Sequence, residues 1–540
     1  MNRKIVYKDI SPTAADSAVA SISDMQPFSN LPLLFQEDVE FQQFQTCEHN
    51  QTILDGTFPS LVAEGNTFAL WSLSQSRTDL TFTTPVVLQI SFGGAMESSV
   101  GITIISDVLG NCWPTHVNIK WYRSSALLSS KDFYPTSTNY GCINQVQYYT
   151  DLTITFYALN FSERFLKLQQ IPFGIERVFA EDEIESFDVY EAVDLTGVTL
   201  SINTMNCRIN SDDDVAFMFQ RRQPLLVYSN NVLYGSFYLD KWTMSAKKRF
   251  SLDNIDYVGL LDSQADYMGG IYTGEAAGDV ILDIVRNPKM VTIDASLAGV
   301  PLYGWLPISG RRDALAAIAV AIGGVIDSSR GKPIKIYPAP TAQSSNITID
   351  RVYNDISKTS NFPYTGVNLI EHTFSKSQES TELYRAAFSG TITVQFQNPA
   401  YNLFISNGTI NEQHANYAVI TSANDAVETI LSGYTYTDSQ RSVEIDNPLV
   451  TENEQTKVQT FDKLHLVSAY NSAAVAQRLY NYYTKGTKIN GSIVLDGEKV
   501  SDIVQIALPE GDTATGQIEQ FALAIGAQRI KAKAVIQRAE

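Results

Sequence analysis

Cysteine and histidine are both scarce in this chain, with four and five copies among 540 residues. Cys47, Cys112, Cys142 and Cys207 are scattered and form no C-x-x-C pair, which excludes a disulfide-built fold and a zinc-finger spacing. We expect reduced thiols in a protein made in a cytoplasm. No histidine lies in an H-E-x-x-H or H-x-H setting, so the sequence predicts no metal site and no cofactor.

Long apolar runs and an excess of basic charge are also missing. The most apolar run, Ala314 to Ile322, is far shorter than the roughly 20 residues that span a bilayer. The start, Met1-Asn2-Arg3-Lys4, lacks the apolar core of a signal peptide. The formal charge is −19, and such a surface repels nucleic acid. We therefore expect no membrane anchor and no nucleic-acid partner.

Catalytic signatures are scarce as well. There is no G-x-S-x-G elbow, and the glycines of residues 269–274 lack the Walker lysine and the Rossmann spacing, which favours a tight turn before a helix. Carboxylates cluster at 181–185 and 212–214. An acidic chain offers pairs of carboxylates by accident, and the second cluster lacks the EF-hand pattern, which favours a solvated loop. We predict no catalytic residue and no enzyme.

What the chain does contain is β-forming sequence for several domains. Aromatic residues make up 11% and hydrophobic residues 44%, and the length suits three or four domains. Residues 1–45 read as an irregular lead-in that docks on its own chain or a neighbour through Phe28 and Phe35. Short alternating strands then predict an antiparallel sandwich with Trp71, Trp121 and Phe156 in its core: residues 86–90, 102–105, 117–121, 152–156 and 165–168.

The texture changes twice further on. Ser229-Asn230-Asn231 predicts a hairpin turn within strand-rich sequence. Two helices follow, one capped by Thr273 over 276–286 and a buried one over 313–322 that Gly323-Gly324 ends. Strands then return up to residue 540, interrupted by a helix over 472–483. The last three strands, at 503–506, 516–519 and 530–536, suit a small barrel.

Aromatic and basic residues at the predicted sandwich loops are the candidate ligand contacts. Trp113 lies beside Pro114, Tyr122-Arg123 follows a strand, and Tyr140 lies in the predicted loop 137–140. Aromatic rings stack on the apolar face of sugars while polar neighbours bind the hydroxyls. Trp113, Tyr122, Arg123 and Tyr140 are therefore candidates for glycan contact. The alternative is that these rings pack loop against loop.

Residues 44–175 resemble the galactose-binding-like (discoidin-type) modules in tail proteins of phages of Gram-positive bacteria. The matching stretches are residues 50–56, 70–74, 98–104, 119–122 and 164–168. The resemblance implies a jelly-roll sandwich. Sugar binding is common in the wider superfamily, many members only bridge proteins, and no specific ligand residue carries over.

Residues 176–540 resemble a phage tail hub or baseplate hub protein, through weak motifs that recur in serial order: residues 220–224, 256–261, 270–274, 312–315, 446–450, 473–483 and 501–506. That family implies two β-barrel-like domains flanking an α/β insertion. It also implies a homotrimeric ring that matches the tail tube on one face and receives a spike or fibre on the other.

The predicted fold class is mainly β with an α/β insertion: a jelly-roll β-sandwich, then two β-barrel-like hub domains that flank an α/β domain. We place the lead-in at 1–45, the sandwich at 46–176, the first barrel at 177–258, the α/β domain at 259–344 and the second barrel at 345–540. The predicted function is a structural virion protein at the tail tip, made in the host bacterial cytoplasm. Its expected partners are the tail tube protein, other baseplate proteins and cell-surface glycan. The alternatives are a secreted or virion-associated enzyme acting on cell-wall glycan and a receptor-binding fibre subunit.

Overall fold

The computed structural model describes residues 3–11, 13–36, 45–46, 48, 51, 68–211, 223–245, 248–331, 333–360, 364–448, 457–526 and 529–538. Two compact units emerge. We call residues 5–179 with 211–225 the sandwich unit, and residues 1–4, 180–210 and 226–540 the main unit. Cys47, His49, the acidic run 212–214 and parts of the resemblance stretches 50–56, 220–224 and 446–450 lie outside the described residues.

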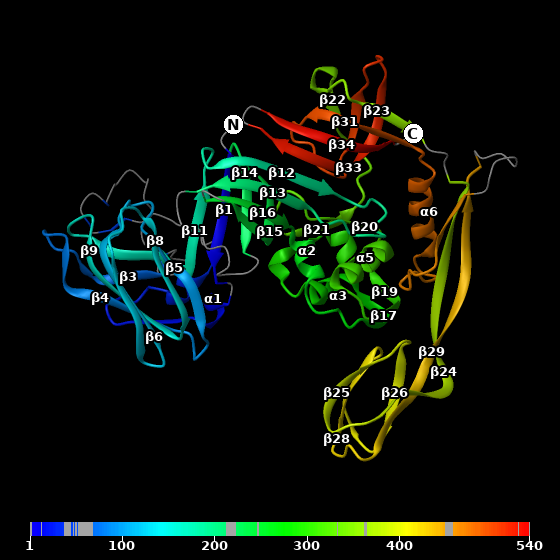
Figure 1. The fold of residues 1–540 in the computed structure, drawn as a ribbon, viewed down its shortest axis with the longest axis horizontal. Coiled ribbons are helices and arrows are strands. Elements are labelled where there is room, and N and C mark those ends of the chain that lie inside the picture. The colour runs from blue at the N-terminus through cyan, green and yellow to red at the C-terminus, as the bar shows by residue number, and fades with distance from the viewer. Residues whose placement is uncertain are drawn as a thin grey trace. The chain divides into compact units, whose positions relative to one another are not determined.

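The sandwich unit, blue to cyan in Figure 1, is built from two antiparallel sheets. Its core draws buried side chains from both sheets, since alternate residues of each strand point inward. The predicted antiparallel sandwich is thereby confirmed. One sheet has the order β2 (Val19–Ile22), β4 (Thr81–Ser91), β9 (Asp151–Leu159), β6 (Pro114–Arg123), β7 (Ala126–Phe133); the other has the order β3 (Leu70–Gln75), β10 (Phe165–Gln170), β5 (Glu97–Ser106), β8 (Asn139–Tyr149).

The predicted core aromatics of the sandwich are buried. Trp121 and Phe156 are fully covered within the main core, and Trp71 is 3% exposed in a smaller cluster with Phe68. The core prediction is therefore confirmed for all three residues.

The N-terminal segment is more regular than the sequence suggested. Arg3–Ile10 forms β1, which pairs antiparallel with β11 (Gly174–Phe179), and β2 pairs with β4; a short helix, α1 (Ala14–Ser17), and a 3-10 turn, η1 (Leu31–Phe35), complete it. The prediction of an irregular lead-in was wrong. Eight residues are enough to form a strand once the edge of a neighbouring strand is available for pairing. Docking on its own chain is confirmed: Phe35 stacks on Phe173 and Phe28 meets Trp71 edge-on.

The main unit is organised by one large sheet that joins two distant parts of the sequence. β12 pairs antiparallel with β33, with Asp188 opposite Ala524. Asn230 and Asn231 both have positive φ in the β14–β15 turn, which confirms the predicted hairpin. The strand order is β14 (Pro224–Ser229), β15 (Val232–Ser245), β16 (Arg249–Ile255), β13 (Thr204–Asn210), β12 (Ile184–Ala192), β33 (Thr513–Ile525), β34 (Ile530–Arg538), β31 (Thr487–Val494), β23 (Ser357–Ser360). Off this path, β32 (Ile503–Ala507) pairs with β33, and β22 (Gln343–Ile347) pairs with β32.

Between the two strand groups the chain forms an α/β layer, green in Figure 1. The predicted helices are confirmed as α3 (Ala277–Val285) and α5 (Arg311–Ile322), and Gly323 ends α5 in the left-handed conformation. Thr273 does not cap α3, because it lies within β17 and Ala276 precedes the helix. The other elements are α2 (Tyr257–Asp262), β17 (Gly270–Ala276), η2 (Pro288–Met290), β18 (Val291–Ile293), α4 (Ala295–Ala298), β19 (Pro301–Leu306), β20 (Gly324–Asp327), β21 (Ile334–Pro338) and η3 (Ile349–Arg351).

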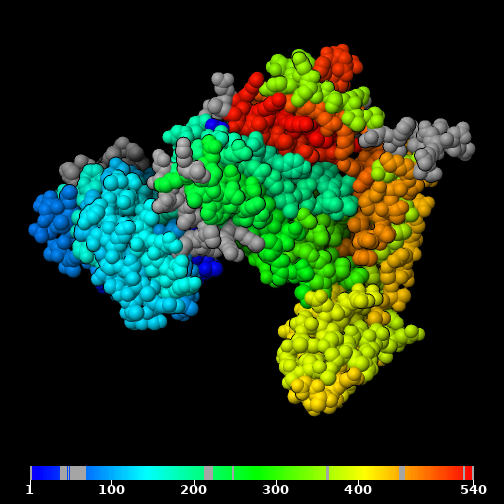
Figure 2. Space-filling view, viewed as in Figure 1, coloured from blue at the N-terminus to red at the C-terminus, as the bar shows by residue number. Residues whose placement is uncertain are grey.

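A long two-stranded ribbon, which the sequence did not reveal, extends from the main unit. β24 (Gly366–Ala387) pairs antiparallel with β29 (Glu428–Asp446) along most of their lengths, flanked by β26 (Ala400–Ser406) and β30 (Val458–Phe461). Its tip carries the sheet β25 (Gly390–Gln395), β28 (Tyr417–Ser422), β27 (Thr409–Gln413) with a small core of its own, seen as a compact yellow lobe in Figure 2. The predicted helix over 472–483 is confirmed as α6 (Ser472–Tyr483).

Candidate functional sites

The four residues predicted to contact glycan do not gather in one place. Trp113 directly precedes β6, whereas Tyr122 and Arg123 are its last two residues. At about 3.3 Å per residue, roughly 30 Å of strand separates Trp113 from Tyr122. A single sugar ring cannot touch both, so the sandwich offers at most separate contacts.

Trp113 and Tyr140 are each held by the sandwich itself. The Trp113 N–H donates to Asn160 Oδ1 at 2.9 Å, and its carbonyl accepts from the Asn160 N–H at 3.0 Å. Tyr140 is not in a loop: it lies in β8, opposite Ile104, and packs half-buried against the core. Arg123 lies over the Tyr148 ring at 5.5 Å. Glycan contact by these residues stays a prediction.

Tyr122 borders a hollow on the outer face of the five-stranded sheet, with a volume of about 380 Å³. The ladder places Tyr122 opposite Asp151, Asp151 opposite Ser91, and Ser91 opposite Val19, so these four side chains form one row across the sheet. The row thus sets a phenol ring beside a carboxylate and a serine hydroxyl. Only the cross-strand register brings these residues together, which is why the sequence showed Tyr122 alone.

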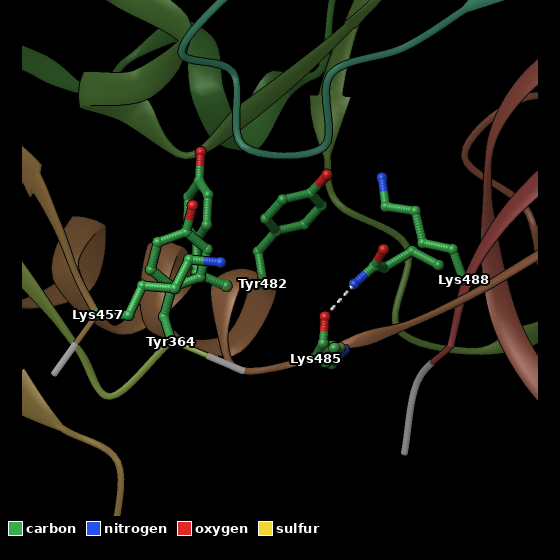
Figure 3. A pocket seen from close by; sticks show the side chains of 8 residues that line it. Tyr364, Lys457, Tyr482, Lys485 and Lys488 are labelled. Carbon is green, nitrogen blue, oxygen red and sulfur yellow. Dashed lines mark hydrogen bonds between the residues drawn. The ribbon is translucent and has the colours of Figure 1, made fainter. Parts of the chain in front are cut away.

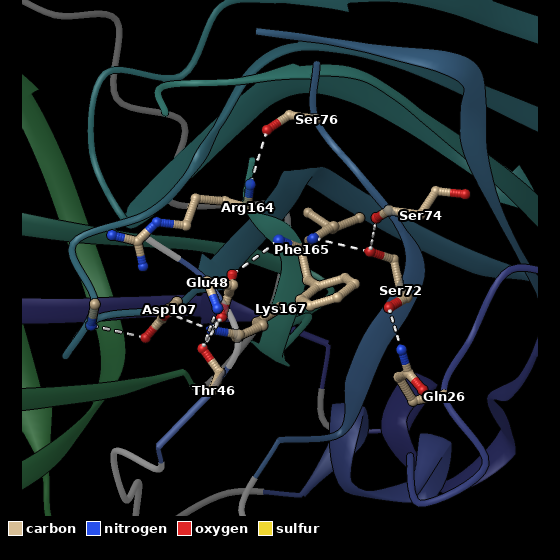
Figure 4. Close-up of polar contacts among 12 residues, drawn as sticks. Gln26, Thr46, Glu48, Ser72, Ser74, Ser76, Asp107, Arg164, Phe165 and Lys167 are labelled. Carbon is tan, nitrogen blue, oxygen red and sulfur yellow. Dashed lines mark hydrogen bonds and ion pairs between the residues drawn. The ribbon is translucent and has the colours of Figure 1, made fainter. Parts of the chain in front are cut away.

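A buried ionic cluster holds the other sheet of the sandwich (Figure 4). Lys167 Nζ lies 2.5 Å from Glu48 Oε2 and 3.4 Å from Asp107 Oδ2, and all three side chains are at most 5% exposed. The Phe165 N–H donates to Glu48 Oε1 at 2.9 Å. The ammonium also lies 4.6 Å from the centre of the Trp71 ring. The donors and acceptors of the cluster are thus paired with one another. We therefore interpret the cluster as a structural contact between strands rather than a reactive site.

The described cysteines are buried and chemically quiet. Cys112, Cys142 and Cys207 are free, and burial raises the pKa of each thiol to about 12; for Cys112 the neighbouring Asp107 carboxylate adds to the effect. Because the thiolate is the reactive form, these thiols are inert near neutral pH.

Tyrosines and lysines line a pocket of about 230 Å³ in the main unit (Figure 3). Lys457 Nζ lies 4.2 Å from the centre of the Tyr364 ring. Tyr482 Oη donates to Glu519 Oε1 at 2.5 Å, and Lys488 Nζ lies 2.6 Å from Glu519 Oε2. Burial lowers the pKa of Lys485. The pocket therefore combines tyrosine ring faces with lysine ammonium groups, of which Lys488 is paired with Glu519.

Acidic residues of the stretch 181–185 make local structural contacts. Glu181 Oε1 accepts from the Arg3 guanidinium at 2.6 Å, and Glu183 Oε2 accepts from the Ala180 N–H at 3.1 Å. These contacts give Glu181 and Glu183 structural partners, and they do not favour a glycosidase pair.

The α/β layer is fastened to the large sheet by buried polar contacts. The Arg330 guanidinium bonds both carboxylate oxygens of Glu191 on β12, at 2.5 and 2.9 Å. Asp256 caps α2 by accepting from the Gly259 N–H at 2.9 Å and also accepts from the Asn203 N–H at 2.9 Å. Burial raises the pKa of Asp256 to about 6. Such contacts tie residues of the α/β layer to strands of the large sheet.

Solved structures similar to this chain include three tail proteins. The chain is similar to a tail protein from Neisseria meningitidis MC58, with TM-score 0.42 and 9% identity over 67% of this chain and 93% of that one. It is similar to the 43 kDa tail protein of prophage MuSo2 from Shewanella oneidensis, with TM-score 0.42 and 11% identity over 67% and 96%. A prophage tail protein from Listeria monocytogenes gives TM-score 0.39 and 9% identity over 66% and 91%.

No family model matches the chain, and no curated protein matches it in sequence. Among the described residues, no helix has both the length and the apolar character needed to cross a bilayer.

Proposed function

We propose that this chain is a structural hub subunit at the tip of a phage-type tail, and that three copies form a ring joining the tail tube to a spike or fibre. One observation carries the proposal: strands from residues 184–255 and from 487–538 form a single sheet, with an α/β layer between them in the sequence. This arrangement agrees with the two β-rich parts and the α/β insertion that the hub resemblance implies. The proposal keeps the boundaries predicted for the hub domains, at 177–258, 259–344 and 345–540.

The buried polar contacts within the main unit suit a mechanical role. A subunit at the end of a tube has to transmit force between neighbours without unfolding, and the buried Arg330–Glu191 pair and the Asp256 cap hold the layers together. The long ribbon formed by β24 and β29 adds a separate arm with its own small core. An arm of this kind can reach a neighbouring subunit.

The sandwich unit would provide a peripheral contact with host-surface glycan or a neighbouring tail protein. Its outer hollow at Tyr122, Asp151 and Ser91 supports the glycan role, because ring and polar groups meet there. A Tyr122→Ala variant should lose glycan-array signal, whereas Tyr134→Ala, an exposed tyrosine elsewhere in the same unit, should keep it. Equal signal from both variants would remove the hollow from the proposal.

The oligomeric state tests the hub role directly. Light scattering across a concentration series, with negative-stain images of the same sample, should show about three times the 59.8 kDa chain mass and a closed ring. A labelled copy should then be found at the tail tip of intact particles. A chain that stays monomeric with its tube protein present, or a label found along a fibre, would overturn the hub assignment. Wall hydrolysis by the purified chain would favour the enzyme alternative.

A further inference from the structure

Two histidines and an aspartate from three separate segments meet at the base of the ribbon. His372 lies on β24 and Asp438 on β29; the ladder sets His372 opposite Gln440 and Phe374 opposite Asp438. Residues directly opposite in an antiparallel ladder share a face, so His372 and Asp438 are diagonal neighbours on the same side. His465, from the loop between β30 and α6, lies against that face, with its ring centre 4.7 Å from that of His372.

The loop that carries His465 is tied down on both sides. The His372 N–H donates to the Val467 carbonyl at 2.9 Å, and the Trp305 N–H donates to the His465 carbonyl at 3.1 Å. Gly304 allows this approach: its φ is +119°, and a Cβ there would lie 2.2 Å from the His465 carbonyl oxygen. The position of His465 is therefore fixed by backbone hydrogen bonds between its loop and the strands β24 and β19.

The three side chains bring possible metal-ligand atoms close together. One nitrogen of each histidine and one Asp438 oxygen lie within 4.8 Å of one another. His372 Nδ1 is 2.8 Å from Asp438 Oδ2, which also accepts from Gln440 Nε2 at 2.8 Å. Among the described residues, His372 Nε2, Asp438 Oδ1 and His465 Nδ1 are buried without a hydrogen-bond partner. Such atoms are costly to bury unless something binds them.

We propose that His372, Asp438 and His465 form a binding site for one divalent transition-metal ion of the zinc class. Two imidazoles and a carboxylate are ligands that Zn²⁺ takes, whereas Mg²⁺ and Ca²⁺ prefer oxygen alone. Tetrahedral Zn²⁺ sets its ligand atoms roughly 3.3 Å apart, a small contraction of the present cluster. The fourth position would hold water.

The surroundings of the site fit a structural ion. The Trp305 ring lies 5.1 Å from the His465 ring, Phe374 flanks both histidines, and His372 is 1% exposed. A bound ion would clamp the ribbon to the loop that precedes α6, and the backbone of that loop is hydrogen-bonded to Trp305 of β19. The three ligands lie far apart in the sequence, at residues 372, 438 and 465, so no short sequence motif indicates the site. The inference stands independently of the tail assignment.

The test is metal uptake by the full chain after stripping with chelator. Wild type should take up one equivalent of Zn²⁺ per chain in competition with a chromophoric chelator. Co²⁺ should give the visible bands of a nitrogen- and oxygen-bound ion. Excess Mg²⁺ should leave both signals unchanged.

Variants at two ligands keep the test independent of any one folding defect. His465→Gln and Asp438→Asn should each weaken Zn²⁺ binding at least tenfold. His414→Gln, at an exposed histidine 3.7 Å from Glu412 on the ribbon tip, should bind as wild type does. Circular dichroism would verify that each variant is folded. Wild-type chain with no saturable uptake, or folded ligand variants that bind as tightly as wild type, would overturn the proposal and leave a hydrogen-bonded His372–Asp438 pair.

Discussion

Replacing Lys167 by methionine should unfasten one sheet of the sandwich unit. The substitution keeps the volume of the side chain but removes the ammonium that lies against Glu48 and Asp107. Two carboxylates are then left buried without their common cation. Removing one partner of a buried pair costs about 3–5 kcal/mol.

Hydrogen exchange read by mass spectrometry measures the effect where it arises. A loss of about 3 kcal/mol corresponds to roughly 150-fold faster exchange of amides that open with the unit. Peptides from β3 and β10 should show it in Lys167→Met. Lys131→Met is the matched control, because Lys131 is an exposed lysine of the same unit that donates to the Ile143 carbonyl. Its effect should stay within about 0.5 kcal/mol.

A second substitution tells charge from packing. If the penalty is the stranded carboxylate, Glu48→Gln combined with Lys167→Met should recover much of the lost protection, because the amide needs no counter-charge. Exchange in Lys167→Met that matches the Lys131→Met control would refute the reasoning. Equal losses in the single and double variants would show that the contact with Trp71, rather than the ion pair, carries the stability.

Three further predictions concern two buried charged residues and one glycine with positive φ. Burial raises the pKa of Asp9 from 3.8 to about 7, with Arg177 partly opposing it. The Asp9 carboxyl therefore loses its proton at lower pH in the unfolded chain than in the folded one, so the free energy of unfolding should fall as pH rises from 5 to 8. Asp9→Asn should remove that slope, about 2–3 kcal/mol across this range in urea titrations, and an unchanged slope would contradict it. Gly304→Ala should cost about 2–3 kcal/mol in thermal unfolding, since it combines a positive φ with a close backbone contact; a wild-type Tm would contradict this. Arg330→Met should cost about 3–5 kcal/mol at pH 8 by stranding Glu191, whose pKa burial raises. Urea titrations should show a smaller loss at pH 5, and an equal loss at both pH values would contradict it.

Local signals in the sequence predicted the elements that local physics determines. Gly323 ends α5 because glycine adopts the left-handed conformation at little cost, and Asn230-Asn231 forms the hairpin turn because asparagine tolerates positive φ. Alternation predicted the sandwich strands and the burial of Trp121. All of these depend on contacts between residues close in sequence or on burial alone.

Features that depend on pairing between distant residues could not be predicted in this way. The ribbon formed by β24 and β29 needs a register that no turn sets, since the whole tip sheet lies between the two strands. The row that places Tyr122 beside Asp151 is likewise a product of strand order. Tyr140 looked like a loop residue because Ser, Thr and Asn precede it, yet pairing with Ile104 draws it into β8.

The ladder between β12 and β33 also imposes an order on synthesis. Residue 188 leaves the ribosome long before residue 524, its partner in the sheet. At 5–20 residues per second, β12 waits roughly 17–67 s for its neighbour. During that time its edge is an open template for other nascent chains, a hazard that lengthens when elongation slows. The two sheets of the sandwich, which use strands only up to residue 170, can close meanwhile. Yield of folded protein should therefore depend on translation speed and chaperone supply more in the main unit than in the sandwich unit.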